Sequence, residues 1–328
     1  MTFYETFRKN LALFLAVLLI VCMAGCGRVK ESGGTRVITD DQGAELRVSA
    51  HPVRIVSLTY GTDEILLGLV DTSRVKGLSK YAGNPDISFV TKEEQQAVGQ
   101  IAEVNPEMIM ALKPDLVIAS TNVPMNMVEV LKNSGIPVYV SLVAVNWEQM
   151  ETKVRGVARA VNEEEAGEAM VSDMNRKREA LDRKLSVIPP EKERTALALS
   201  FRGILGKKGT LFSEILAMAH VKDGAAVYDV PKGTNAYLSN EILPEINPDI
   251  LLMPVWKIKE GDNETEFEKE LLANPAFQDV KAVKNHNLVL FPEKYKYVMS
   301  QHITDAMEAA AKAVYPELFE NSVSSGGK

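Results

Sequence analysis

The pattern that most constrains the fold is an alternation of short apolar strands with helical segments. Strand-like runs rich in β-branched residues lie at 54–58, 75–78, 116–119 and 138–141, and helical periodicity fills 62–70, 106–112 and 125–134 between them. Strands that alternate with helices form mostly parallel sheets covered by helices on both faces. The sequence therefore predicts an α/β protein.

The alternation is interrupted once, by residues 147–187, which carry no strand pattern. Apolar residues recur at helical spacing from 163 to 185, acidic residues crowd the start of this stretch and basic ones its end, and Pro189-Pro190 stops it. Strands resume at 196–200, 250–253 and 288–291, and a last helix is expected at 300–315. We predict an N-terminal lobe at 37–146, a helical linker at 147–190, a C-terminal lobe at 191–320 and a disordered tail at 321–328.

The two predicted lobes resemble each other in sequence. Residues 107–118 align with 241–252, each as a helix, a Pro-Asp turn and a buried strand, and residues 62–66 align with 212–216. Helix, Pro-Asp turn and strand is a common α/β connection, but two matched pairs in the same order favour a duplicated lobe.

The N-terminus has the anatomy of a secretory signal: Arg8 and Lys9, an apolar run, and small residues before Cys26. Met23-Ala24-Gly25-Cys26 resembles the lipobox of bacterial lipoproteins. The resemblance implies a signal peptide at 1–25, acylation of Cys26, and a tether at 26–36 that holds the protein on the extracytoplasmic face of the membrane. The alternative is a transmembrane helix, because the uncharged stretch 10–27 is near the lower end of the ~17–25 residues that span a bilayer. Both readings place the rest of the chain outside the cytoplasm.

Composition narrows the possible functions. The net charge of −7 gives no electrostatic footprint for nucleic acid, and 46% hydrophobic residues are ordinary for a globular protein. Cys22 and Cys26 are the only cysteines. The protein after Cys26 therefore has neither a disulfide nor a thiolate metal site, and its stability must come from the burial of apolar side chains.

Residues 51–79, 98–120 and 237–254 together resemble the substrate-binding proteins of iron-siderophore, haem and cobalamin ABC importers, and the resemblance extends over residues 37–319. It implies two α/β lobes joined by a rigid backbone helix, with a shallow ligand cleft between them and only a small rocking motion on capture. It also implies a monomeric binding protein without a cofactor, whose partners are a permease and its ATPase subunits.

Glu64 and Glu214 occupy matched positions in the two lobes. Carboxylates in the first turn of a helix are favoured by the helix dipole and need no further role. In the family, one exposed Glu in each lobe docks on permease arginines, so the resemblance implies that Glu64 and Glu214 do so here.

Ligand contacts are expected beyond the carboxyl ends of the strands, where open α/β sheets bind ligands. Aromatic faces pack against chelate rims, and basic side chains pair with acidic ligand groups. The residues that follow the predicted strands and meet this description are Tyr60, Lys80, Tyr81, Thr121, Asn122, Phe201, Arg202, Trp256, Tyr295 and Tyr297.

We predict that the ligand is a ferric siderophore or a related metal chelate, with haem and cobalamin as alternatives. Haem would need an axial ligand, for which Tyr60 is the best candidate, and His302 in the first turn of the last helix could face the cleft. The four histidines form no cluster, which disfavours a bare metal ion, and His220 reads as a packed or surface residue. An enzyme is disfavoured because no nucleotide-binding or nucleophile motif occurs, and the Gly/Lys-rich segment 203–210 fails the P-loop spacing and reads as a hairpin or loop.

Overall fold

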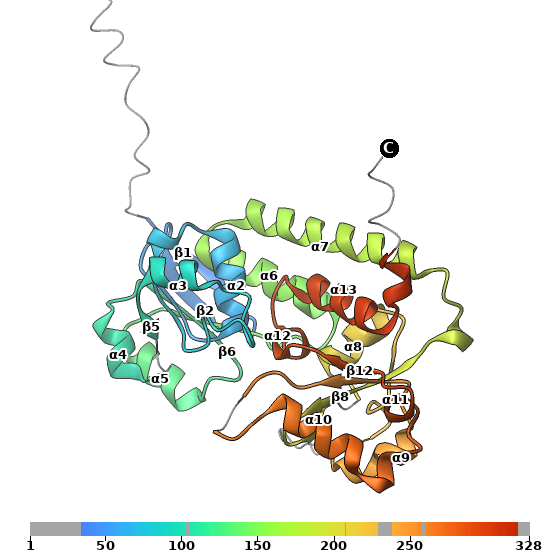
Figure 1. Cartoon of the computed structure of the whole chain (residues 1–328). Coiled ribbons are helices and arrows are strands. Elements are labelled where there is room, and N and C mark those ends of the chain that lie inside the picture. The colour runs from blue at the N-terminus through green and yellow to red at the C-terminus, as the bar shows by residue number, and fades with distance from the viewer. Residues whose placement is uncertain (1–33, 103–104, 207, 229–237, 258–259, 321–328) are drawn as a thin grey trace, which may run out of the picture.

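The computed structural model describes residues 34–102, 105–206, 208–228, 238–257 and 260–320 (Figure 1). It contains two mainly parallel sheets, each with its own helices, and two long helices between them in the chain. The predicted fold class is confirmed. Cys26, the signal segment and the tail at 321–328 lie outside the described residues, and none of the described helices is long and apolar enough to cross a membrane.

The N-terminal lobe contains a parallel sheet in the order β5-β4-β3-β6-β7, preceded by an antiparallel hairpin of β1 and β2. The strands are β1 (Thr35–Thr39), β2 (Glu45–Ser49), β3 (Ile55–Ser57), β4 (Val75–Ser79), β5 (Ile101–Ala102), β6 (Leu116–Ser120) and β7 (Val138–Ser141). The helices are α2 (Tyr60–Leu69), α3 (Lys92–Val98), α4 (Pro106–Ala111) and α5 (Met125–Asn133).

The hairpin shortens the expected tether. Thr35 and Arg36, which the sequence analysis placed in the tether, form the start of β1. The Arg36 guanidinium donates to the carbonyl of Ala160 at 3.1 Å and lies 3.4 Å from the carboxylate of Glu164. These contacts and the pairing with β2 fix residues that composition alone marked as flexible.

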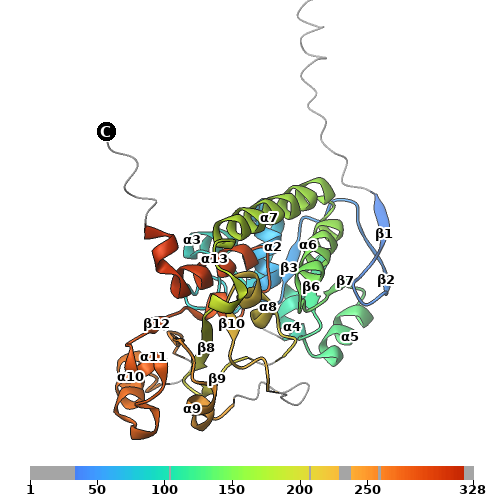
Figure 2. The same cartoon turned by 90° about the vertical axis from the view of Figure 1, so that its right-hand side faces the viewer.

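The linker and the C-terminal lobe follow. Helices α6 (Trp147–Val161) and α7 (Glu164–Leu185) form the linker and lie side by side (Figure 2). The second sheet has the order β10-β8-β11-β12, with β9 antiparallel to β8. Its elements are β8 (Thr195–Ser200), β9 (Gly203–Ile204), α8 (Leu211–Met218), β10 (Lys222–Asp223), the 3-10 turn η3 (Asn240–Ile242), α9 (Leu243–Ile246), β11 (Ile250–Met253), α10 (Glu264–Ala273), α11 (Lys281–Lys284), β12 (Leu288–Leu290), α12 (Glu293–Lys296) and α13 (Ile303–Val314).

The duplication predicted from the sequence is visible in the topology. The order β10-β8-β11-β12 repeats β4-β3-β6-β7, with each strand in the equivalent place along the chain. One hydrogen bond between a helix and a strand is repeated in both lobes, with the serine and the aspartate exchanged between the two elements. In the first lobe Asp63 of the helix accepts from Ser79 of the second strand, and in the other lobe Ser213 of the helix donates to Asp223 of the second strand.

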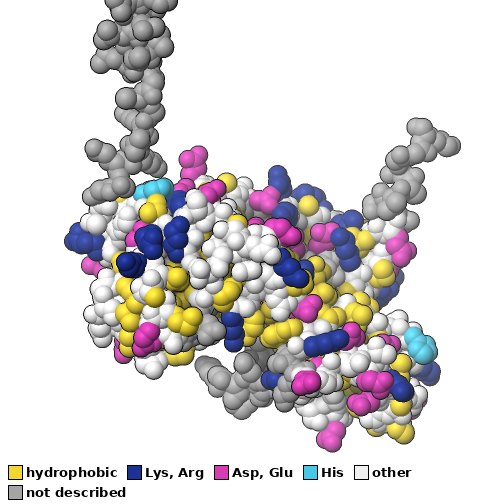
Figure 3. All heavy atoms as spheres, turned by 60° about the vertical axis from the view of Figure 1, so that its left-hand side comes forward, with side chains coloured by type: hydrophobic (Ala, Val, Ile, Leu, Met, Phe, Trp, Pro, Cys, Tyr) yellow, Lys and Arg dark blue, Asp and Glu magenta, His cyan; other side chains and the backbone are white. Residues whose placement is uncertain are grey.

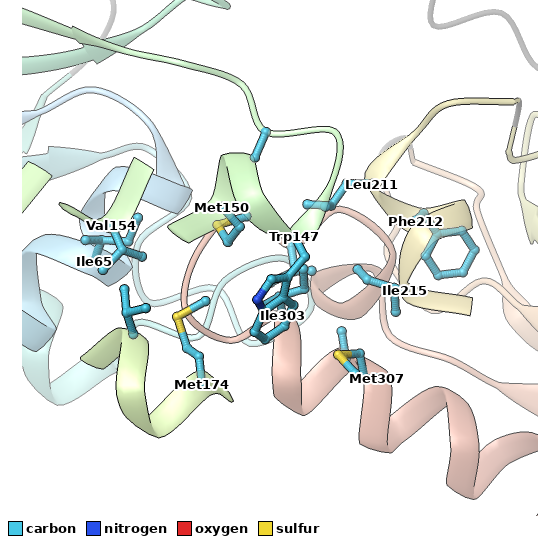
Figure 4. Packing of buried hydrophobic residues seen from close by; sticks show 14 of the residues in the cluster. Ile65, Trp147, Met150, Val154, Met174, Leu211, Phe212, Ile215, Ile303 and Met307 are labelled. Atoms are coloured by element: carbon cyan, nitrogen blue, oxygen red, sulfur yellow. The ribbon is translucent and has the colours of Figure 1, made fainter. Parts of the chain in front are cut away.

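One continuous core connects the lobes. Figure 4 shows Val154 of α6 beside Ile65 of α2, with Met150 of α6 nearer Trp147, while Met307 of α13 lies near Ile215 of α8. Buried side chains of both lobes and both linker helices belong to the same cluster. A lobe therefore cannot swing far without opening close-packed apolar contacts, which favours small relative motions.

A second contact joins the lobes at the start of α2. The Tyr60 hydroxyl donates to the carbonyl of Tyr297 at 2.8 Å, and the Gln301 side chain donates to the carbonyl of Glu64 at 2.9 Å. Between these bonds, Gly61 faces Met299: a Cβ at position 61 would lie 2.5 Å from the Met299 carbonyl oxygen. Only glycine permits this approach of the two backbones.

Gly61→Ala tests this contact. The added methyl group meets backbone, so we expect the free energy of unfolding to fall by about 1–3 kcal/mol, measured by urea denaturation. Gly68→Ala on the same helix is the matched control, because its Cβ would meet side chains alone: the flexible tip of Met170, and the Gln301 Nε2 at an ordinary contact distance of 3.5 Å. It should be neutral or stabilising, since alanine favours a helix over glycine by up to ~1 kcal/mol. Equal stability of wild type and Gly61→Ala would contradict the close approach.

Candidate functional site

A cavity of about 200 Å³ lies where the lobes meet, on the carboxyl ends of β3, β4, β5 and β6. This is the edge of an open α/β sheet where ligands bind, beside the central strand at which the chain order reverses. The lining comes mostly from the first lobe and consists of Leu58, Thr59, Tyr60, Gly61, Ser79, Lys80, Tyr81, Ala102, Ser120, Asn122, Val143, Lys153 and Met299.

An aromatic row borders the cavity. The rings of Tyr60 and Tyr81 meet edge to face at 6.1 Å, and Tyr81 meets Trp256 of the other lobe in the same way at 5.8 Å. The Lys80 ammonium lies 4.9 Å from the centre of the Tyr81 ring. The row presents flat apolar faces beside a positive charge. Figure 3 shows hydrophobic side chains gathered along the boundary between the upper and lower parts of the molecule.

The structure brings part of the predicted ligand set together. Tyr60, Lys80, Tyr81 and Asn122 line the cavity, and Trp256, which is not in the lining, packs on Tyr81. Their contact with a ligand stays a prediction.

The other five predicted residues do not line this cavity. Phe201 packs on Phe267 within the C-terminal lobe, and Tyr295 packs between Phe89 and Phe291. Tyr297 offers its carbonyl to Tyr60, while Arg202 and Thr121 are exposed. Strand ends were located correctly from the sequence, but the direction of each side chain depends on the loop that follows the strand.

The sequence analysis missed five polar or flexible lining residues: Thr59, Ser79, Ser120, Lys153 and Met299. Lys153 could have been found from the sequence, because helical spacing places it on the apolar face of α6 beside Met150, Val154 and Val157. A lysine at a position that periodicity marks as buried is exceptional.

The structure does not support axial ligation of haem by Tyr60. Its hydroxyl already donates to a backbone carbonyl, and burial raises the pKa of the phenol far above its usual value, which opposes the phenolate. His302 stacks on Phe89 at 4.3 Å and its Nδ1 lies 2.5 Å from Asp305, so it is not in the cavity lining. His220 lies 3.2 Å from Asp182, away from the cavity.

The predicted exposure of Glu64 is wrong. Only 4% of the residue is exposed, because segments of both lobes cover it. The carboxylate accepts hydrogen bonds from the Ser88 hydroxyl at 3.1 Å, the Phe89 amide at 3.0 Å and the Ser300 hydroxyl at 2.5 Å. In this arrangement Glu64 cannot reach a permease arginine. Glu214, its counterpart in the other lobe, is half-buried in the first turn of α8.

Asp63 holds the cavity rim in place. It is fully buried and accepts from the Ser79 amide at 3.0 Å and from the Ser79 hydroxyl at 2.5 Å, which fixes the start of the loop carrying Lys80 and Tyr81. Burial raises the pKa of its carboxyl group to about 7, although hydrogen bonds from serines act in the opposite direction.

Residues 55–295 match the family described as periplasmic binding protein. This chain belongs to that family. It is 26% identical to the Fe(3+)-citrate-binding protein YfmC of Bacillus subtilis, over 86% of this chain and 89% of the relative. It is also 23% identical to the ABC transporter substrate-binding lipoprotein YvrC of the same organism, over 95% of this chain and 99% of the relative.

The fold is also that of solved structures. The periplasmic binding protein MolA of Haemophilus influenzae, solved with molybdate, superposes with a TM-score of 0.71 at 20% identity, over 88% of this chain and 94% of that one. The family match and the relatives identify the chain as a substrate-binding protein of an ABC importer.

The raised pKa of Asp63 predicts a pH-dependent effect on stability. A carboxyl group whose pKa is raised on folding contributes stability below about pH 4, and this contribution is lost as the pH rises through about 7. Asp63→Asn cannot ionise and should escape this loss. The free energy of unfolding of the variant, relative to wild type, should therefore increase from pH 5 to pH 8 in urea titrations. Parallel pH profiles for the two proteins would contradict the assignment.

Proposed function

We propose that this protein is an extracytoplasmic lipoprotein that captures a ferric siderophore or a related iron chelate and delivers it to a membrane permease, without catalysing a reaction. The observation that carries the proposal is the cavity at the meeting of the lobes, with an aromatic row and a lysine at its rim. Support also comes from YfmC, named for ferric citrate, and from the ferric-anguibactin-binding protein FatB of Vibrio anguillarum, which is 24% identical.

The dimensions of the cavity favour a compact chelate. Its volume of about 200 Å³ is below the roughly 300–1,000 Å³ of sites that enclose a drug-sized ligand. A ligand held here inserts one part and leaves the rest at the rim, against Tyr81 and Trp256. A small iron chelate fits this description better than haem, because the candidate axial ligand, Tyr60, already donates its hydroxyl to the carbonyl of Tyr297.

The anchor is proposed from the sequence and the relatives. YvrC and YfiY of Bacillus subtilis are named as lipoproteins, and Cys26 stands at the end of a lipobox-like segment. The described fold begins with β1 at Thr35, so acylation of Cys26 would hold the lobes close to the membrane.

A different pair of glutamates fits permease docking better than Glu64 and Glu214. Glu107 lies in the first turn of α4 and Glu241 lies in η3, and these are the first residues of the two aligned segments 107–118 and 241–252. Both are exposed, and each precedes the equivalent strand of its lobe. We propose that Glu107 and Glu241 pair with permease arginines, where charge-assisted hydrogen bonds set orientation as well as affinity.

Tryptophan fluorescence tests the ligand class. Trp256 packs on Tyr81, which lines the cavity, while Trp147 is 3% exposed and donates to Glu151 at 2.9 Å. Ferric citrate or a ferric siderophore should quench the wild type with sub-micromolar affinity. The quench should survive Trp147→Phe and be lost in Trp256→Phe. A Soret band with haem and no response to any ferric chelate would overturn the proposal, and so would quenching that depends only on Trp147.

Uptake of radioactive iron tests docking. Glu107→Arg combined with Glu241→Arg should abolish uptake while leaving chelate affinity unchanged, because each lost charged contact costs about 1.5–3 kcal/mol. Glu45→Arg combined with Glu191→Arg is the matched control: both residues are exposed, one lies in each half of the chain, and the change in charge is the same. Normal uptake by the first double variant would remove these residues from the docking surface.

A further inference from the structure

Two lysines are buried in the described part of the chain, and their surroundings differ. Lys296 is 4% exposed, and its ammonium donates to the carbonyls of Leu199 and Met253 and to the Glu293 carboxylate at 3.0–3.1 Å. Lys153 is 1% exposed, yet its ammonium has neither a hydrogen bond nor an ion pair with any described residue. The Lys153 Nζ is not among the enclosed unpaired polar atoms, so the ammonium opens onto the cavity, where a charge so largely removed from water is costly unless it finds a partner.

Lys153 lies at the cavity. It belongs to the lining, on the side of α6, together with Ser79 and Ser120 at the ends of β4 and β6. The hydroxyl of Ser120 accepts from the Asn122 amide, which leaves its proton available to a ligand. A ligand in the cavity could therefore supply the partner that the Lys153 ammonium lacks among the described protein groups.

A second feature of the cavity also suits negative charge. Helix α2 starts at the cavity with Tyr60 and Gly61, and its N-cap Thr59 makes no side-chain capping bond. The Thr62 and Asp63 amides donate hydrogen bonds to the Thr59 carbonyl, whereas the Tyr60 and Gly61 amides have no acceptor among the described residues. Free amides at a helix N-terminus attract anions.

We propose that the cavity is an anion subsite, in which Lys153 and the free amides of Tyr60 and Gly61 hold a negatively charged oxygen group of the transported ligand. Lys80 and Asn122 at the rim are placed to contact the same group or its neighbour. This inference rests on the proposed function and narrows its substrate class. The group is either the carboxylate of a chelate such as ferric citrate or a free tetrahedral oxyanion.

The state of Lys153 links the subsite to pH. Burial lowers the pKa of its ammonium to about 8, while the charges of Glu64 and Asp41 act in the opposite direction. The other titratable groups at the cavity are Lys80, Tyr60 and Tyr81, and Asp63 lies behind its rim, bonded to Ser79. Below pH 8 Lys153 is largely charged. The part of the anion affinity that depends on Lys153 should therefore fall as the pH rises through about 8 to 9.5, because the proton that attracts the anion is lost.

The experiment pairs the two buried lysines. Isothermal titration calorimetry of the full chain with ferric citrate, and separately with molybdate, phosphate and sulfate, shows whether a carboxylate or a free oxyanion is bound. Lys153→Met should weaken the binding of whichever anion binds at least tenfold and abolish its fall above pH 8. The same variant should be as stable as wild type or more so, since it removes an unpaired buried charge. Lys296→Met should be clearly destabilised, since the two carbonyls and the carboxylate that accept from Lys296 would lose their donor.

The outcomes separate this inference from the proposed function. Binding of ferric chelates that Lys153→Met leaves within twofold overturns the anion subsite and leaves the iron-chelate function in place. Oxyanion binding that depends on Lys153, without binding of any ferric chelate, supports the subsite and overturns the iron-chelate function. Absence of both kinds of binding overturns both, and destabilisation of Lys153→Met to the level of Lys296→Met shows a structural lysine and overturns the subsite.

Discussion

The buried carboxylate of Glu64 ties the two lobes together at the edge of the ligand cavity. Within its own lobe it accepts from Ser88 and the Phe89 amide, and from the other lobe it accepts from Ser300. Its own backbone carbonyl accepts from Gln301. A carboxylate removed from water needs such donors, so separation of the lobes here would leave several polar groups unsatisfied at once. The position of α2, and with it the cavity, depends on this group of bonds.

The same arrangement explains why the cavity can hold charge. The shared apolar core and the Glu64 contacts fix α2 and α6 against each other, so the amides at the start of α2 and the ammonium of Lys153 keep their places without a ligand. Groups that are already oriented lose little entropy when they bind. Lys296 provides the contrast to Lys153, because two carbonyls and a carboxylate of the protein accept hydrogen bonds from its ammonium.

The two lobes repeat a topology but not an environment. The hydrogen bond between the first helix and the second strand is present in both lobes, as Asp63 with Ser79 and as Ser213 with Asp223. Next to this hydrogen bond, Glu64 is buried between lobes while Glu214 is half-exposed. Equivalent positions in a duplicated chain therefore give equivalent backbones, but each side chain takes its role from the neighbours that assembly brings.

The sequence by itself determined the elements: the apolar period predicted the strands at 116–119 and 138–141 and the helix at 163–185, and the structure has them within one or two residues. It also located the strand ends, and Tyr60, Lys80, Tyr81 and Asn122 at these ends line the cavity, while their contact with a ligand stays a prediction. These features depend on residues close together in the chain, whose spacing fixes which face is apolar.

Only the tertiary structure decided the fate of Glu64, the orientation of Tyr295 and the presence of Lys153 in the cavity. Glu64 is covered by Ser300, 236 residues away in the chain, and Tyr295 turns toward Phe89 rather than toward the cavity. Burial and the direction of a side chain depend on contacts between distant segments, and these contacts cannot be predicted from the local spacing of apolar residues. Periodicity placed Lys153 on an apolar face, but the close approach of α2, α6 and the strand ends gave that face an opening for a ligand.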